Sequence, residues 1–207
     1  MELAHFILGI SGASGIILAF RTLQALTACG HQVDLVMTRD ALVTANLEMG
    51  LEFSTVEKFL ANLTAEQQKL VHPYKINDFM APIASGSAPS DGMVITPCSM
   101  ASLAAIALGL SDNLLRRAAD VALKERRPLV IVPRESPFNA IHLQHMLSIT
   151  QNGGIIVPPI PGWYTKPQTL EDVENFIVGR TLDALKVKTD LYRRWGAAIG
   201  KSPQRLL

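Results

Sequence analysis

The sequence lacks an excess of charge of either sign, and it has few cysteines. Its 207 residues include 19 Lys and Arg against 18 Asp and Glu, and a formal net charge of +1 gives no reason to expect nucleic acid or an anionic membrane as a partner. Cys29 and Cys98 cannot form a disulfide framework, so we expect a protein of the reducing cytoplasm. The first residues have no basic flank followed by a small-residue cleavage site, and we expect no signal peptide.

Signals for a membrane span and for a metal site are also weak. Residues 92–110 form a run of nineteen residues without a charged side chain, which just reaches transmembrane length. Pro97 and Ser99 interrupt this run, and a buried strand, a turn and a buried helix explain it better. No Asp-rich magnesium motif is present, and His142 and His145, one helical turn apart, have no carboxylate nearby. We therefore expect neither a membrane span nor a metal site.

Hydrophobic residues make up 48% of the chain and charged residues 18%, which is typical of a globular protein. Apolar segments alternate with amphipathic ones, and this alternation predicts βαβ units with right-handed crossovers. We expect one domain over residues 1–207, with 186–207 as a C-terminal tail, built as a three-layer, doubly wound α/β fold around a mostly parallel sheet. Strands are expected at 3–9, 32–38, 91–96, 128–133 and 154–157, and helices at 16–28, 39–49, 53–71 (in two pieces), 99–109, 112–126, 137–150 and 169–185.

Three polar residues are expected to cap the helices that follow them, namely Ser99, Ser111 and Thr169, the last in a capping box with Asp172. Pro137 suits the first turn of the helix after the fourth strand. Residues 74–91 are expected to form a long loop, and loops of this length are usually functional.

A glycine-rich turn at residues 9–15 joins the first strand to the first helix. Its G-x-x-G-x-x-G spacing is not the dinucleotide fingerprint, and no lysine follows it as in a Walker A loop. The second strand ends in Thr38 and Arg39, where a dinucleotide site would have an acidic residue. The pattern indicates a mononucleotide phosphate site with Ser14 and Thr38 as hydroxyl donors. The alternative is a tight turn whose small residues serve only helix–sheet packing.

Two further segments follow predicted strands and carry polar side chains. Residues 97–102 form a second strand-to-helix junction with hydroxyls and free N–H groups, in which Cys98 is interpreted as a small buried hydrophobe. Arg134 and Glu135 follow a fully apolar strand, where substrate meets the edge of such a sheet. The alternative for this pair is a surface ion pair.

Three more candidates lie further from the glycine turn. Lys124 belongs to a K-E-R-R segment at the end of a helix, where cations ordinarily complement the helix dipole. Arg180 shares an apolar stripe with Val173, so it either snorkels to the surface or binds an anion. Tyr164 follows a proline-rich turn, from which its hydroxyl can donate to such an anion.

Several blocks of the sequence together resemble one family. They are the glycine turn at 9–15, S-G-S at 85–87, P-C-S at 97–99, R-A-A-D-V at 117–121, L-K-E-R-R-P at 123–128, V-P-R-E at 132–135, and P-P at 158–159 with Tyr164. In these blocks the chain resembles the UbiX-type flavin prenyltransferases, a family earlier described as aromatic acid decarboxylases. The likeness runs from residue 3 to about residue 185. Two positions depart from the commoner pattern: Phe79 stands in place of tryptophan and Thr38 in place of serine.

The resemblance implies a flavodoxin-like, Rossmann-like flavoprotein in a large homo-oligomer, a dodecamer, with FMN near subunit contacts. The implied reaction is a metal-independent transfer of a dimethylallyl group from dimethylallyl monophosphate to N5 and C6 of reduced FMN. The product, prenylated FMN, would serve a UbiD-type decarboxylase.

The resemblance also implies roles for individual residues. Glu135 would protonate the leaving phosphate, Ser14 would lie close to N5 of the flavin, and Glu48 would assist proton movement with Ser14. FMN would be bound by Gly12, Ala13, Ser14, Thr38, Ser99, Met100, Ala101, Ser102 and Arg134. The substrate phosphate would be held by Lys124, Arg134, Tyr164 and Arg180. The sequence leaves open whether Lys124 serves its own site or that of a neighbouring subunit.

Three other functions compete with this one. A flavin-dependent decarboxylase of peptidyl or pantothenoyl cysteine would carry a P-A-S-A-N-T segment, where this chain has P-C-S-M-A-S at 97–102. An FMN-dependent decarboxylase of hydroxybenzoate-type acids is the second alternative, although the residues form an anion-binding set without a separate carboxylate-activating cofactor. A non-enzymatic FMN carrier would leave Glu135 and Arg180 without a role.

Overall fold

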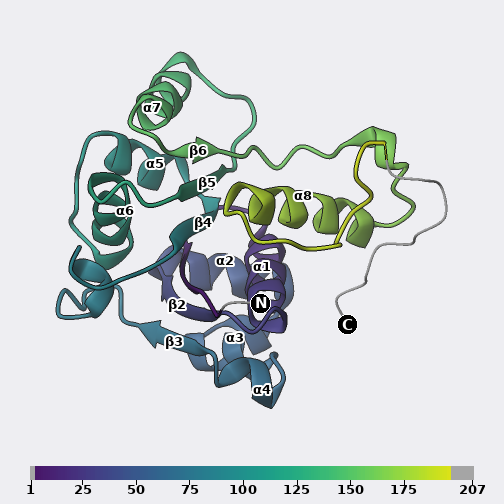
Figure 1. The fold of residues 1–207 in the computed structure, drawn as a ribbon, viewed down its shortest axis with the longest axis horizontal. Helices are drawn as coiled ribbons and strands as arrows, with labels where there is room; N and C mark the ends of the chain where they lie inside the picture. Colours follow the sequence, from purple (N-terminus) through teal and green to yellow (C-terminus); the bar gives the residue numbers. More distant parts are fainter. Residues whose placement is uncertain (1–2, 197–207) are drawn as a thin grey trace.

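The fold is built around a six-stranded sheet whose strands all run in the same direction (Figure 1), in the order β3-β2-β1-β4-β5-β6. The computed structural model describes residues 3–196. The strands are β1 (His5–Ile10), β2 (Gln32–Met37), β3 (Val71–Tyr74), β4 (Gly92–Cys98), β5 (Leu129–Pro133) and β6 (Ile155–Ile156). This order confirms the expected doubly wound arrangement, because the strand order reverses direction between β1 and β4.

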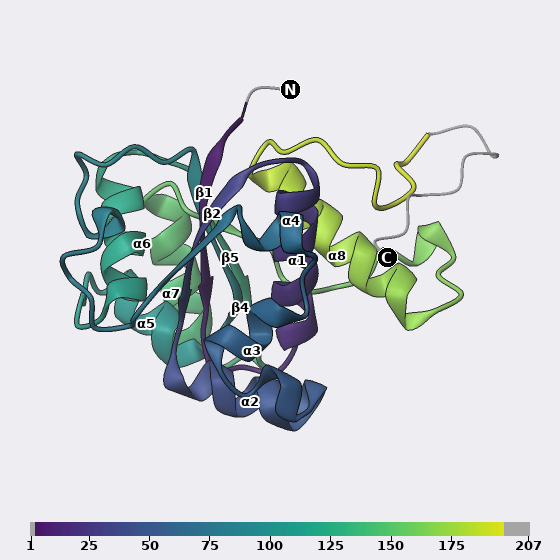
Figure 2. The same cartoon turned by 90° about the horizontal axis from the view of Figure 1, so that it is seen from below.

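Helices cover both faces of the sheet, which gives three layers (Figure 2). One face carries α1 (Ile16–Ala28) and α8 (Leu170–Ala184), with α2 (Arg39–Met49), α3 (Val56–Ala61) and α4 (Ala65–Gln68) beside α1. The other face carries α5 (Met100–Ala107), α6 (Leu114–Lys124) and α7 (Ala140–Gln151). Short 3-10 turns are formed by η1 (Leu51–Phe53), η2 (Pro82–Ala84) and η3 (Trp163–Thr165).

Alternate side chains of the central strands supply the core on each face. Leu8 of β1 packs with α1 and α8 in one cluster, whereas Ile7 packs with α5 and α6 in the other. All seven residues of β4 are buried. The uncharged run at 92–110 is therefore a buried strand followed by a helix against the sheet, as expected. Among residues 3–196, no helix is both long and apolar enough to cross a membrane.

Strand β3 is not predicted by the sequence. The predicted helix extends to Val71 and the predicted loop begins at Tyr74. The strand has four residues, includes Pro73, and pairs with β2 alone at the edge of the sheet. Proline is tolerated there because an edge strand has one side that makes no ladder. A short edge strand with a proline has too weak an alternation to be read from sequence.

Two helix starts were also placed wrongly. Asn113, not Ser111, caps α6 by accepting a hydrogen bond from the Arg116 N–H at 3.0 Å. Pro137 lies before α7, which begins at Ala140 after the cap residue Asn139. The expected caps at Ser99 and at Thr169, with its capping box, are confirmed.

A buried serine ties the carboxyl ends of β1 and β4 together. The Ser11 hydroxyl donates to the Pro97 carbonyl at 3.1 Å and accepts from the Ser99 N–H at 2.7 Å. The Ser11 N–H donates to the same carbonyl at 3.2 Å. These bonds fix the glycine turn against the first residues of α5.

Replacing Ser11 with alanine should destabilise the protein by about 1–3 kcal/mol, because the Ser99 N–H loses its acceptor in a partly buried place. Urea unfolding would measure the change. Thr22→Val is the control, since it removes a buried hydroxyl that bonds only to its own helix, at the Leu18 carbonyl. A loss no larger than that of the control would contradict a linking role for Ser11.

Candidate functional site

The carboxyl ends of β2, β1, β4 and β5 meet as neighbours at one edge of the sheet, because all strands are parallel. This edge brings together the glycine turn, Thr38, the start of α5 and Arg134 with Glu135. The strand order reverses between β1 and β4, and ligands of doubly wound folds bind at this reversal. The residues predicted from sequence to bind FMN are thus gathered at one place.

The glycine turn leaves no room for side chains at its centre. A Cβ atom at Gly12 would lie 2.4 Å from Cβ of Asp40 in the first turn of α2. Gly15 has φ +99°, a left-handed conformation that favours glycine. The Ala13 N–H donates to the Ser11 carbonyl at 2.8 Å. The turn is therefore tight, as the packing interpretation required. It also lies at the carboxyl end of β1, where the strand order reverses between β1 and β4.

Glu48, near the end of α2, occupies the amino terminus of α1. Its carboxylate accepts hydrogen bonds from the Gly15 N–H at 3.0 Å and from the Ile16 N–H at 2.9 Å. A glycine turn before a helix is typically one that offers backbone N–H groups to a phosphate, but here the N–H groups of Gly15 and Ile16 are bound by Glu48. The helix dipole favours an anion there, and Glu48 supplies it. Within residues 3–196 no hydrogen bond joins Glu48 to Ser14.

The other hydrogen-bond donors at the carboxyl ends of the strands lie at Ser14, at Thr38 and at the start of α5. Ser99 caps α5 by accepting from the Ser102 N–H at 3.3 Å. In the described part of the chain the N–H groups of Met100 and Ala101 have no hydrogen-bond partner. Thr38 caps α2 through its oxygen and keeps its proton to donate. Backbone N–H groups and hydroxyls of this kind match the phosphate and carbonyl oxygens of a mononucleotide such as FMN.

Cys98 faces the core at the end of β4. Its side chain is fully buried, and this burial raises the pKa of the thiol to about 12. A thiol with this pKa stays protonated at ordinary pH and is a poor nucleophile. The expectation of a small buried hydrophobe is confirmed.

Arg134 and Glu135 follow β5 at the edge and both are exposed. The Arg134 N–H donates to the Cys98 carbonyl at 3.0 Å, which holds the end of β5 against that of β4. Glu135 accepts from the Ser136 N–H at 3.0 Å through Oε1. No ion pair between Arg134 and Glu135 is found in the described residues, so the surface ion pair considered above does not form.

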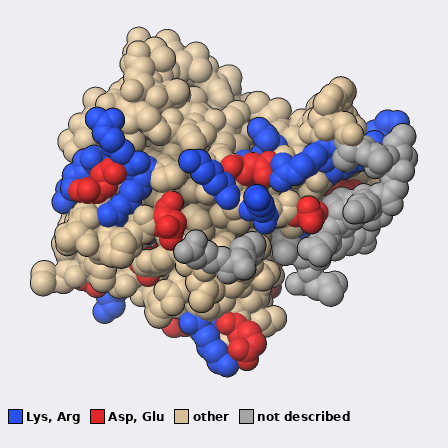
Figure 3. All heavy atoms as spheres, viewed as in Figure 1, with Lys and Arg blue, Asp and Glu red and all other residues tan. Residues whose placement is uncertain are grey.

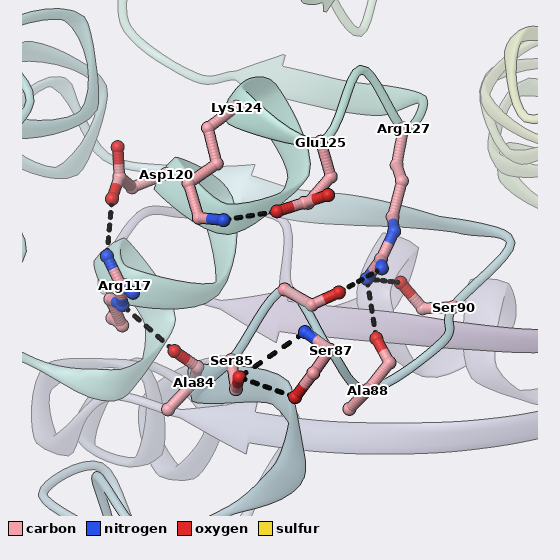
Figure 4. Close-up of polar contacts among 11 residues, drawn as sticks. Ala84, Ser85, Ser87, Ala88, Ser90, Arg117, Asp120, Lys124, Glu125 and Arg127 are labelled. Atoms are coloured by element: carbon pink, nitrogen blue, oxygen red, sulfur yellow. Dashed lines mark hydrogen bonds and ion pairs between the residues drawn. The ribbon is translucent and has the colours of Figure 1, made fainter.

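Lys124 lies at the opposite, amino ends of the strands. It ends α6, which precedes β5, whereas Arg134 follows β5. The five residues of β5, at roughly 3.3 Å each, therefore separate Lys124 from Arg134. Lys124 pairs with Glu125 over Gly86, where a Cβ would lie 2.6 Å from Nζ (Figure 4). One chain therefore does not bring Lys124 to Arg134.

Arginines hold the loop beside Lys124 in place (Figure 4). Arg127 donates to the carbonyls of Gly86 and Ala88, each at 2.7 Å, and Arg117 donates to the carbonyl of Ala84 at 2.9 Å. The loop that passes Ser85 and Ser87 is thus fixed along α6 by its backbone. This edge presents an ordered basic surface.

Tyr164 and Arg180 form a third group, on α8 and the segment before it. Arg180 is exposed, with 54% of its side chain accessible, so its guanidinium reaches the surface, as a snorkelling arginine does. It lines a cavity of about 590 Å³ whose walls include Ile156, Pro158 and Phe176. The ring of Tyr164 packs edge-on against Phe176 at 6.0 Å. A guanidinium beside apolar walls suits a ligand with an anionic group and a hydrocarbon part.

Lys and Arg side chains gather in two places on one face of the molecule, over α6 and over α8 (Figure 3). Both are outside the carboxyl edge where the FMN-binding candidates meet.

Ser11 and Asp183, the acceptor for Arg180, were missed by sequence reasoning. Ser11 was signalled only by its position inside the glycine turn, and Asp183 only by its spacing of three residues from Arg180. In residues 3–196 no three His, Cys, Asp or Glu side chains come together to hold a metal ion.

Comparisons with known proteins identify the family of the chain. The flavoprotein family model matches residues 1–182. The flavin prenyltransferase UbiX of Chlamydia pneumoniae is 44% identical over 191 residues, which cover 92% of this chain and 97% of that protein.

Two solved structures share the whole fold. The crystal structure of AnUbiX (PadA1) in complex with FMN and dimethylallyl pyrophosphate has a TM-score of 0.84 and 37% identity, and covers 95% of this chain and 100% of that one. A dodecameric FMN-dependent Ubix-like decarboxylase from Escherichia coli O157:H7 has a TM-score of 0.84 and 38% identity, covering 93% and 100%. With a flavoprotein model over most of its length and relatives well above 30% identity, this chain belongs to the UbiX flavin prenyltransferase family of flavoproteins.

Proposed function

We propose that this protein transfers a dimethylallyl group from dimethylallyl monophosphate to N5 and C6 of reduced FMN, and that a UbiD-type decarboxylase uses the prenylated flavin. The observation that carries the proposal is the juxtaposition, at the β1/β4 switch point, of a mononucleotide cradle with Arg134 and Glu135. A flavin carrier needs the cradle alone. A cation and a carboxyl group beside it suit a reaction that releases an anion.

FMN is held by Gly12, Ala13, Ser14, Thr38, Ser99, Met100, Ala101, Ser102 and Arg134. When bound and reduced, it supplies the nucleophilic nitrogen and ring carbon that receive the allylic group. The backbone donors at Met100 and Ala101 and the hydroxyls of Ser14 and Thr38 orient it. Glu48 accepts from the N–H of Gly15, the residue after Ser14, and this contact supports a role for Glu48 in holding the backbone beside Ser14.

The leaving phosphate determines the other roles. An ionised allylic monophosphate would leave as the phosphate trianion, and one proton converts it to the hydrogenphosphate dianion, so cations and a proton donor lower the barrier. Arg134 stabilises the developing charge, and Glu135, beside it on the same strand end, delivers the proton. Tyr164 and Arg180 bind the phosphate, and apolar side chains such as Phe176 and Ile156 exclude water from the hydrocarbon part.

Lys124 joins the site of another copy of the chain. Its place at the amino ends of the strands, remote from Arg134 in one chain, supports this assignment. A dodecameric relative supports an assembly in which such edges meet. The site is then completed between subunits, and the isolated chain lacks a phosphate ligand.

Glu135→Gln should slow prenylation by about 10²–10⁴-fold, because the amide cannot protonate the leaving phosphate. FMN affinity, measured by fluorescence titration, should not change. Glu66→Gln is the matched control, since Glu66 lies exposed on α4 and pairs only with Lys69. Undiminished prenylation in Glu135→Gln would rule out its role as proton donor.

Complementation between two inactive variants should show whether Lys124 acts in the site of a neighbouring subunit. Lys124→Ala and Arg134→Ala chains, each nearly inactive, should recover about one quarter of wild-type activity when co-expressed, because that share of mixed sites has both residues intact. Arg134→Ala with Glu135→Gln should not recover, since both residues lie on one strand end. Failure of the first pair to recover would place Lys124 outside the shared site.

Mass measurement of the flavin tests the reaction itself. Reduced FMN incubated anaerobically with the protein and dimethylallyl monophosphate should gain the mass of one dimethylallyl group. The diphosphate serves as a second donor in a parallel incubation. An unchanged flavin with both donors, together with loss of carbon dioxide from a hydroxybenzoate, would favour the decarboxylase instead.

A further inference from the structure

The chain after α8 folds back along this helix (Figures 1 and 2). Tyr192 anchors it, with 8% of the residue exposed and its ring 5.0 Å from that of Phe176. Gly179 provides the space, because a Cβ there would lie 2.4 Å from Cδ1 of Tyr192. Leu191 is also buried against this cluster. Residues 187–194 therefore form an ordered strap on α8, which we call the C-terminal strap.

Asp183 joins the strap to Arg180. Its carboxylate accepts from the Tyr192 hydroxyl at 2.5 Å and from Arg194 through two nitrogens at 2.7 and 3.0 Å. Arg180 is its third partner, at 3.3 Å. Burial of Asp183 opposes its charge, but the hydrogen bonds from Arg194 and Tyr192 outweigh it and lower the pKa of the carboxyl group. The carboxylate thus stays charged at neutral pH.

Arg194 and Arg180 share the carboxylate unequally. Arg194 takes both oxygens at short distances, whereas Arg180 touches one oxygen and the Tyr192 hydroxyl, at 3.4 Å. The guanidinium of Arg180 is therefore oriented without being neutralised. It lines the apolar cavity of about 590 Å³ and a second cavity of about 800 Å³, whose walls also include Lys186 and Lys188.

We propose that Asp183, held by Tyr192 and Arg194 of the C-terminal strap, positions Arg180 to bind the phosphate of the allylic donor. This inference rests on the proposed role of Arg180 as a phosphate ligand. Asp183 limits the rotation of the Arg180 side chain, and Arg194 supplies the counter-charge that keeps Asp183 from capturing Arg180 in a full ion pair. Asp183 also lines both cavities and Arg194 the larger one, and with Tyr192 they are positioning residues, because they act on the donor through Arg180.

Asp183→Asn keeps the shape of the side chain and removes its charge. We expect the KM for dimethylallyl monophosphate to rise about tenfold, the loss typical of one charge-assisted hydrogen bond, with a smaller change in kcat. Tyr192→Phe keeps the ring packing and should raise KM in the same direction. Asp190→Asn is the control, since it removes an equal charge from the same cavity, and its KM should stay at the wild-type value.

The decisive measurement repeats Asp183→Asn in an Arg180→Ala background. If Asp183 acts through Arg180, the second substitution should add nothing to the KM of Arg180→Ala, while FMN affinity and melting temperature report any loss of fold. Additive effects would overturn the positioning role and leave the proposed function intact. A wild-type KM in Arg180→Ala would instead overturn the phosphate role of Arg180, and this inference with it.

Discussion

All strands of the sheet run in one direction, and this single constraint decides where the chemistry can lie. Their carboxyl ends meet at one edge, and the strand order reverses there between β1 and β4, which is where ligands of doubly wound folds bind. Ser11 holds the two loops together through three hydrogen bonds to the 97–99 segment. The proposed flavin site depends on this link, because its donors come from both loops.

The amino termini of α1 and α5, which follow β1 and β4, are occupied differently. At α1 the first N–H groups are bound by Glu48, an anion supplied from within the fold. At α5 the corresponding groups of Met100 and Ala101 remain available to a ligand. A helix dipole attracts either kind of anion equally well, so only the position of α2 decides which terminus is filled.

The candidate phosphate ligands are distributed over three parts of one chain. Arg134 and Glu135 lie at the carboxyl edge, Lys124 at the amino edge, and Tyr164 and Arg180 beside α8. The proposed phosphate site therefore draws on more than one copy of the chain. Within one chain, the strap on α8 holds Asp183, and Asp183 orients Arg180.

Local periodicity and short motifs were enough to predict the alternation of strands and helices, the glycine turn, the caps at Ser99 and Thr169, and the residue types of the family. The remaining features depend on packing between distant segments. Strand β3, with Pro73, exists only because β2 offers it an edge to pair with. Glu48 reaches α1 because of how α2 packs, and Tyr192 packs on α8 because Gly179 leaves space for its ring. Long-range contacts of this kind leave no local pattern, since each depends on the packing of segments that are distant in the chain.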